Sequence, residues 1–411
     1  GIAETLEAAI ADSLLPRFET GEVDVAERLA HHLRRAGRLA EALEPLRACA
    51  ELLVARGEYD RALDVLDLRD ATIAELGLPA GHHAVDESLL GRAEVKAARG
   101  AFDEAADLAE RALAHAEKHG HDDGIPRALS IGGTVAWHRG DAKTAEARLT
   151  EALQRFDKLG LPSEAARCLR GLAVIAAQEG RAEVAFNAFL ASLELCRHLD
   201  DPYGVAASLI GMGLSDPTTP NGNPRPVEEA LDVCEGRGYV YGVAQAMNAL
   251  GEIARREGRL ADAGTLLRRA LEVSRGLGAR YQETVFGLNL ALSLVAGGRL
   301  REARVELGEC QRRAERYAHR DVLFTIHAAT LRCLVGAPDP KAFRYHVWAA
   351  RRLLDEGSNV ERDAVQLLEG AVGAATTLDA LDVGELRRLV SEAASRGGSA
   401  IPGARNLLTR G

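Results

Sequence analysis

The hydrophobic positions between Gly242 and Gly278 recur at helical spacing in two segments, and one short turn at Gly258 separates them. The stretch has the sequence GVAQAMNALGEIARREGRLADAGTLLRRALEVSRGLG. Apolar residues three and four positions apart form one face of a helix, and that face must pack against another element to leave water. The pattern therefore predicts a helical hairpin whose two helices bury Leu, Ile and Val between them.

Small residues stand at fixed offsets from the turn of this hairpin. Gly251 lies seven residues before Gly258, Ala263 lies five after it, and Ala270 lies twelve after it. A larger side chain at these points would push two packed helices apart. The turn glycine has a separate reason, because the left-handed conformation that ends a helix is strained for residues with a side chain.

From Gly57 onward the same offsets recur with a period close to forty residues, with one double step between Gly180 and Gly258, and the helices before Gly57 come at about half that period. Every turn glycine is followed five residues later by alanine, and a small residue often stands seven positions before it. A second marker stands twenty residues after the turn, where the return helix is expected to end, and Asp200 takes this place once. The turn glycines are Gly37, Gly57, Gly100, Gly140, Gly180, Gly258 and Gly298; the alanines are Ala42, Ala62, Ala105, Ala145, Ala185, Ala263 and Ala303; the earlier small residues are Ala93, Gly133, Ala173, Gly251 and Ala291; and the end markers are Gly77, Gly120, Gly160 and Gly278.

This recurrence predicts an all-α array of stacked hairpins in one continuous body. Residues 1–56 are expected to form helices that lead into the array, the first over residues 2–15 and ended by Pro16. The array itself is expected over residues 57–355, and its pattern weakens after Gly298, where Ala342 and Ala349 keep their offsets from a turn near Ala337. Residues 356–396 are expected to form capping helices, and residues 397–411 a loosely ordered tail.

The Pro, Gly and Asn residues between 211 and 226 predict an irregular loop inserted into one hairpin. Such a departure from a repeat is either a tolerated surface insertion or a contact point.

Composition and charge narrow the class of protein. Apolar residues make up 47% of the 411 residues, aromatic residues only 4%, and the formal net charge is −10. An acidic chain is a poor partner for nucleic acid, whose phosphates require a dense basic face. Six widely spaced cysteines form no C-x-x-C pair, and no apolar run is long enough to span a membrane. A reduced, cytoplasmic protein without nucleic acid or membrane partners is expected.

No motif of a nucleotide-binding or catalytic site occurs in the sequence, so we expect neither an enzyme nor a cofactor. His115 and His119 are one helical turn apart, with His121, Asp122 and Asp123 nearby. That spacing is acceptable for metal ligands, but the residues fall at the end of a helix and in its loop. The sequence alone therefore assigns them no metal.

The segment MNALGEIARREGRLADAGTLLRRALEV resembles the tetratricopeptide repeat, in a lengthened variant. That variant is similar to repeats of bacterial signalling proteins, namely STAND-type ATPases, regulators of the maltose-activator kind and ATPase-linked Ser/Thr kinases. The resemblance implies a right-handed superhelix whose first helices line a concave groove for a protein or peptide. It implies a sensor or scaffold without catalysis, attached to other domains of a parent chain. The known carboxylate clamp of the family is absent, because the matching positions hold Ser130/Thr134, Arg170/Val174 and Asn248/Glu252.

If the first helices face inward as in that family, seven side chains point into the groove and could grip an anionic or mixed polar ligand. Ordinary packing or solvated side chains are the alternative for each. Two other functions stay open, a sensor of a metabolite or oligosaccharide and a transcription regulator that has lost its DNA-binding end. The groove candidates are Arg127, Trp137, Arg167, Arg170, Gln245, Asn248 and Arg255.

Overall fold

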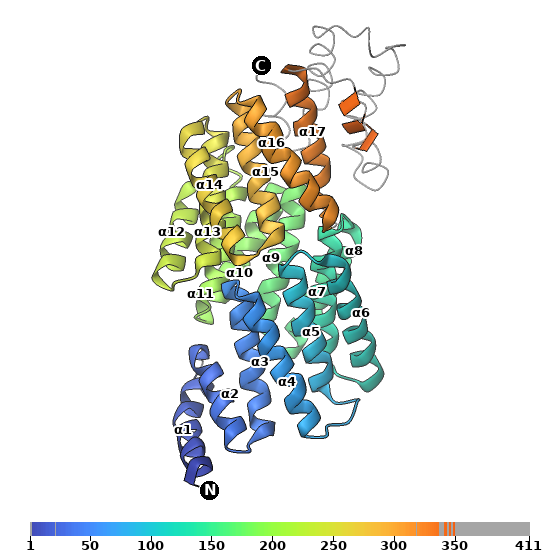
Figure 1. Ribbon diagram of the computed structural model, residues 1–411, viewed down its shortest axis with the longest axis vertical. Coiled ribbons are helices and arrows are strands. Elements are labelled where there is room, and N and C mark those ends of the chain that lie inside the picture. Colours follow the sequence, from blue (N-terminus) through green and yellow to red (C-terminus); the bar gives the residue numbers. More distant parts are fainter. Residues whose placement is uncertain are drawn as a thin grey trace. The chain divides into compact units, whose positions relative to one another are not determined.

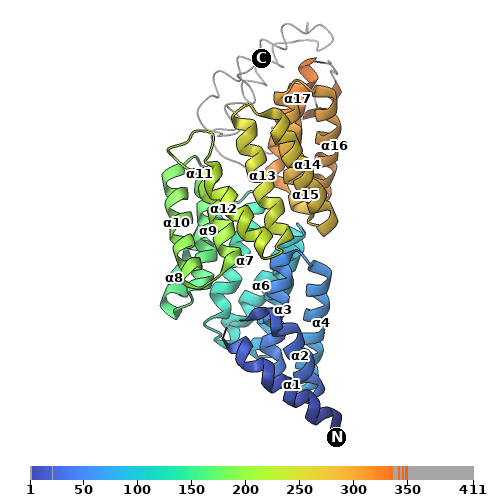
Figure 2. The same cartoon turned by 90° about the vertical axis from the view of Figure 1, so that its left-hand side faces the viewer.

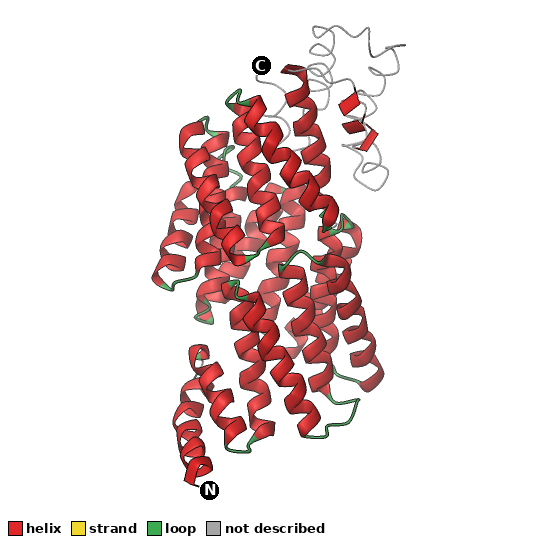
Figure 3. Cartoon of the chain, in the orientation of Figure 1, coloured by secondary structure: helices red, strands yellow, loops and turns green. Residues whose placement is uncertain are grey.

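The protein is described by a computed structural model that covers residues 2–20, 22–317 and 319–336, together with 341–342, 345–346 and 348–349. In this part of the chain the structure is helical throughout and contains no β-strand (Figure 3). The predicted all-α class is confirmed. The elements are α1 (Ile2–Glu19), η1 (Val23–Val25), α2 (Ala26–Arg35), α3 (Leu39–Arg56), α4 (Tyr59–Glu75), α5 (His83–Ala98), α6 (Phe102–His119), α7 (Gly124–His138), α8 (Ala142–Leu159), α9 (Pro162–Gln178), α10 (Ala182–His198), α11 (Pro202–Ser215), α12 (Pro224–Gly236), α13 (Val240–Arg256), α14 (Leu260–Leu277), α15 (Arg280–Ala296), α16 (Leu300–Arg316) and α17 (Arg320–Gly336).

The turn glycines adopt the conformation that the sequence predicts. All seven have a positive φ, between 72° at Gly298 and 85° at Gly140. At Gly258 the next residue closes the end of α13, because Arg259 N donates to Ala254 O at 2.8 Å. Asp200, with a φ of 51°, is the one described residue other than glycine in this conformation.

The small residues lie where two helices approach most closely. The seven alanines five positions after the turns are all fully buried, with 0% of their surface exposed. At Gly251 an added Cβ atom would lie 2.7 Å from Leu267 Cγ, closer than carbon atoms pack. The offsets therefore mark helix contacts, as predicted.

The chain divides into two compact units. Of the described residues, those within 1–135 and 148–161 form one unit, and those within 136–147 and from 162 onward form the other. In the second unit the first helices of successive hairpins contact one another in the order α9, α11, α13, α15 and α17. Each return helix packs against the first helix before it and the one after it, as α14 does between α13 and α15 (Figures 1 and 2).

Apolar side chains from successive hairpins share one core between α13 and α17. It includes Met247, Leu267, Phe286, Leu307 and Ile326. Because each helix here has contacts on both of its sides, neighbouring hairpins in this part of the chain share buried surface.

All six cysteines are buried, and none of them takes part in a disulfide. Burial raises the pKa of Cys49 and Cys234 to about 11 and that of Cys310 to about 12. These thiols are therefore neutral packing groups. No described helix is both long enough and apolar enough to cross a bilayer.

Two predicted boundaries differ from the structure at proline and glycine residues. α1 continues past Pro16 to Glu19, so the expected end at Pro16 was wrong. The Pro16 carbonyl still accepts a hydrogen bond from Thr20 N at 3.0 Å, so only the bond from the missing N–H is lost. The expected capping helices at 356–396, the tail at 397–411 and the turn near Ala337 lie outside the described residues, whereas Ala349 is buried.

The irregular segment between α11 and α12 is shorter than the predicted loop at 211–226. α11 extends to Ser215, and Pro224 begins α12 behind the N-cap residue Asn223. Gly211 is part of α11 because its missing side chain makes room for Phe189, whose ring would lie 2.3 Å from an added Cβ. Here glycine allows close packing instead of ending the helix.

The side chain of Asp216 organises the connection that remains. Its carboxylate accepts hydrogen bonds from Thr218 N at 2.9 Å, from Thr218 Oγ1 at 2.7 Å and from Asn223 Nδ2 at 3.0 Å. Partial burial would raise the pKa of Asp216, but the bonds from Thr218 and Asn223 outweigh it and hold the pKa below its usual value.

We expect Ala263→Leu to destabilise the protein by about 1–3 kcal/mol, because the added carbons must fit into a closed contact between α13 and α14. Ala261→Leu, at an exposed position of the same helix, is the matched control and should change stability by less than about 0.5 kcal/mol. Urea unfolding followed by circular dichroism measures both. Equal stability of the two variants would show that the alanine offset is not a steric requirement.

We expect Asp216→Ala to lower the free energy of unfolding by about 1 kcal/mol near neutral pH. Since the folded-state pKa of Asp216 is lowered, its contribution is present above the unfolded pKa of about 3.9 and is lost as the pH falls through the folded value. The difference from wild type should therefore stay constant down to about pH 4 and shrink below it. Asp232→Ala in α12 is the control, and a gap that does not depend on pH would contradict the assignment.

Candidate functional site

Five polar side chains follow one face of α13. Tyr241, Gln245, Asn248, Glu252 and Arg255 are spaced alternately four and three residues apart, which places them in one row along the helix. We call this row the α13 stripe. Three of its members, Gln245, Asn248 and Arg255, are among the seven groove candidates.

Two members of the α13 stripe bond to side chains of the next first helix, α15, each one residue beyond the equivalent position. Asn289 Nδ2 on α15 donates to Asn248 Oδ1 at 3.0 Å, and Gln282 Nε2 donates to Tyr241 Oη at 2.5 Å. Both pairs are 41 residues apart in sequence, about one repeat of the array. The direct contact of α13 with α15 therefore brings two rows of polar side chains together.

The C-terminal end of the α13 stripe is charged. Glu252 forms an ion pair with Arg256 and lies 4.0 Å from Arg255. Burial would raise the pKa of Glu252, but the two guanidinium groups outweigh it and hold the pKa below its usual value. Burial lowers the pKa of Arg255, which is only 7% exposed.

Two buried polar atoms at the stripe have no hydrogen-bond partner within the described chain, Arg255 Nε and Gln282 Oε1. One is a donor and the other an acceptor. Because a buried polar group without a partner is costly, such atoms indicate where a ligand or water completes the bonding. The arrangement can thus receive both donor and acceptor groups of a bound molecule.

The remaining candidates belong to α7 and α9. Trp137, near the end of α7, donates from Nε1 to Gln178 Oε1 at 2.9 Å, again across 41 residues. Arg127 belongs to the first unit. There, burial would raise the pKa of Glu44, but the hydrogen bond from Arg47 and the positive charges of Arg47 and Arg127 outweigh it. The pKa of Glu44 is therefore below its usual value.

The two arginines of α9 have different environments. Arg170 Nη1 donates to Ser192 Oγ at 3.1 Å and to Cys196 Sγ at 3.4 Å, both on α10, and burial lowers its pKa. Ser192 itself is fully buried and donates to Ala166 O at 3.0 Å. Arg167 is exposed. Arg170 therefore joins α9 to α10 through its guanidinium group.

The sequence did not single out Tyr241, Glu252, Gln282 or Asn289. The signal that could have found them is the repeat itself, because polar residues about one period apart on successive first helices lie at nearly the same level. Glu252 had another signal, its spacing of three and four residues from Arg255 and Arg256.

The structure defines the class of protein. Successive hairpins, left-handed turn glycines and buried small residues at fixed offsets make this a tetratricopeptide-like all-α helical repeat protein. No protein-family model matches the chain, and no curated protein matches it either.

Solved structures share this fold. A Rap protein complexed with Competence and Sporulation Factor is 17% identical with a TM-score of 0.63, and the match covers 87% of this chain and 98% of that one. The Rap conjugation gene regulator of the plasmid pLS20, in complex with the Phr* peptide, is 13% identical with a TM-score of 0.48 over 89% and 93% of the two chains. A STAND protein with a tetratricopeptide repeat sensor from Pyrococcus horikoshii is 14% identical with a TM-score of 0.46 over 85% and 54%. The match to the Rap protein complexed with Competence and Sporulation Factor supports the fold. The other two TM-scores are below 0.5, so nothing is argued from those two structures.

We expect Arg170→Ala to lower the free energy of unfolding by about 2 kcal/mol, because it removes the bonds to α10 and leaves Ser192 and Cys196 beside a gap. Arg167→Ala, one helical turn away and exposed, should change stability by no more than about 0.5 kcal/mol. Thermal and urea unfolding of both variants measures the difference. If Arg170→Ala is as stable as Arg167→Ala, Arg170 does not hold α9 to α10 and is available to a ligand.

Proposed function

We propose that this protein binds a peptide, or an extended segment of a partner protein, along the α13 stripe and the facing side chains of α15. The amide pair Asn248–Asn289 is the observation that carries the proposal. A side-chain amide has both donors and an acceptor, so it can bond to the N–H and C=O groups of an extended backbone whatever the sequence of the peptide. Each amide uses only part of this capacity in the pair.

The length and charge of the α13 stripe specify the ligand further. From Tyr241 to Arg255 it extends for about 21 Å at the helical rise of 1.5 Å per residue. An extended peptide of about six residues covers that distance at 3.3 Å per residue. Arg255 at one end favours an acidic side chain or a terminal carboxylate there, because a guanidinium group binds carboxylates by paired hydrogen bonds.

The fold supports binding over catalysis. In the similar Rap structure the protein is complexed with Competence and Sporulation Factor, and we extend from that protein to this one only the use of the helical repeat to hold a ligand. We accordingly propose a non-enzymatic role. The resemblance of the repeats to those of bacterial signalling proteins leads us to propose further that the module is a sensor or scaffold of a larger signalling protein. The six buried thiols support a cytoplasmic location.

We expect Asn248→Ala and Asn289→Ala each to weaken peptide binding at least about tenfold, because each removes a bonding group and leaves the other amide unpaired. A displayed library of random peptides, selected on the immobilised protein, supplies the ligands, and fluorescence anisotropy gives their Kd. Asn187→Ala is the matched control, since Asn187 is exposed on the return helix α10.

Two results would contradict the proposal. One is a library that yields no peptide binding below about 100 µM, in which case a small-molecule ligand takes precedence. The other is equal affinity of a selected peptide for Asn248→Ala, Asn289→Ala and Asn187→Ala. Circular dichroism of each variant excludes unfolding as the cause of a loss.

A further inference from the structure

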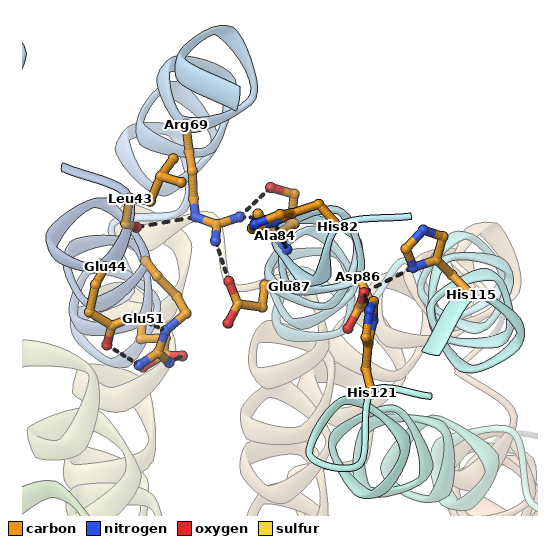
Figure 4. A network of polar contacts seen from close by, with 12 residues as sticks. Leu43, Glu44, Glu51, Arg69, His82, Ala84, Asp86, Glu87, His115 and His121 are labelled. Carbon is orange, nitrogen blue, oxygen red and sulfur yellow. Dashed lines mark hydrogen bonds and ion pairs between the residues drawn. The ribbon is translucent and has the colours of Figure 1, made fainter. Parts of the chain in front are cut away.

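Two histidines converge on one buried carboxylate in the first unit. His115 on α6 and His121 in the α6–α7 connection both face Asp86 on α5, with Nδ1 to Oδ1 distances of 2.9 and 2.8 Å (Figure 4). One ligand atom from each of the three residues lies within 4.8 Å of the others. The sequence had indicated His115 and His121 but not Asp86, because the carboxylate comes from another helix.

The buried carboxylate of Asp86 needs a cation or several hydrogen-bond donors beside it. Its side chain is 2% exposed, and those of the two histidines are 16% and 15% exposed. A buried ionised carboxylate is stable only when a cation or several donors compensate for the lost water. A histidine supplies that charge only when it is protonated or when a metal ion binds it.

The second nitrogen of His115 fixes which form the ring takes. Nε2 lies 2.7 Å from Ala80 O, and a carbonyl can only accept, so Nε2 carries a hydrogen atom. In a neutral ring the lone pair of Nδ1 then faces Asp86 Oδ1 at 2.9 Å, and two lone pairs repel at that distance. A cation between the two atoms removes the conflict. Metal-binding histidines typically donate their other N–H to a carbonyl in this way.

The backbone around the carboxylate leaves no space for another side chain. At Gly124, the first residue of α7, an added Cβ would lie 2.5 Å from Asp86 Oδ2 and 3.0 Å from Ala116 Cβ. Glycine therefore allows α7 to begin directly against the carboxylate and holds the His121 segment over it.

We propose that Asp86, His115 and His121 form a zinc-binding site that ties α5 and α6 to the start of α7. Two imidazole nitrogens and one carboxylate oxygen suit Zn²⁺, whereas Mg²⁺ and Ca²⁺ prefer sites made of oxygen. Ligand atoms on a tetrahedral zinc ion with bonds of ~2.0 Å are about 3.3 Å apart. The two histidine–carboxylate distances of 2.9 and 2.8 Å would have to lengthen slightly to reach that spacing, and the ligand atoms of the three residues already lie within 4.8 Å of one another. Three protein ligands leave a fourth position for water.

The site does not depend on the proposed peptide binding, since its residues and those of the α13 stripe belong to different units. Its neighbour Arg69 shows the other way in which this unit accommodates a buried charge (Figure 4). Arg69 Nη1 donates to Ala84 O at 2.8 Å and to Ser88 Oγ at 2.7 Å, and Nη2 forms an ion pair with Glu87. Asp86 instead faces two imidazole nitrogens, which a metal ion could bind together with the carboxylate.

Isothermal titration of the whole, chelator-treated protein with zinc chloride near neutral pH tests the proposal. We expect one zinc ion per chain with a Kd of about 1 µM or tighter, and no saturable heat with magnesium chloride. His121→Gln should weaken zinc binding at least about tenfold. His198→Gln, at an exposed histidine of α10, is the matched control and should bind as the wild type does.

A second measurement keeps the test decisive if a variant is unstable. Zinc should raise the Tm of the wild type and of His198→Gln, because a ligand that binds only the folded state stabilises it, and should leave the Tm of His121→Gln unchanged. The proposal is overturned if the wild type shows no saturable zinc binding, which would leave a proton as the cation, or if His121→Gln binds zinc as tightly as His198→Gln.

Discussion

The close contact between neighbouring helices, made possible by alanine and glycine at fixed offsets from each turn, is the constraint on which the rest of the structure depends. The seven alanines after the turns are completely buried, and a side chain at Gly251 would collide with Leu267. Since interiors pack at the density of crystals, these positions set how far apart two helices lie and at which level their side chains meet. In the second unit the first helices from α9 to α17 then contact one another in series, and between α13 and α17 the hairpins share a core.

The contact between successive first helices accounts for the position of the polar side chains on α13. On α13 the side chains that face the hairpin core are apolar or small, such as Met247 and Ala254, while the α13 stripe occupies another face. The contact with α15 brings Asn248 to Asn289 across one repeat. A repeat thus converts a period in the sequence into a row of side chains in space, and such a row suits an extended ligand better than a compact one. On α9 the guanidinium group of Arg170 bonds to the hydroxyl group of Ser192 on α10.

Buried charge is accommodated in three ways in this protein. Arg69 has carbonyl, hydroxyl and carboxylate partners from two neighbouring helices. Glu252 lies between two guanidinium groups, which keep it ionised. Asp86 faces two histidines whose charge depends on a proton or a metal ion. Every ion loses favourable hydration when it is buried. Of these three arrangements, that of Asp86 is the one whose charge balance an added metal ion can change.

The sequence by itself determined the hairpins, their turns and their contact points. Each turn requires a left-handed residue, and each contact requires a small one a fixed number of residues away, so both are local properties that spacing records. Proline and glycine were harder to interpret, since Pro16 interrupts no helix and Gly211 serves close packing. Only the tertiary structure decided which polar side chains meet. Asp86 lies 29 and 35 residues from its two histidines, and such encounters depend on the rotation and level of separate helices, which the packing of the whole array sets.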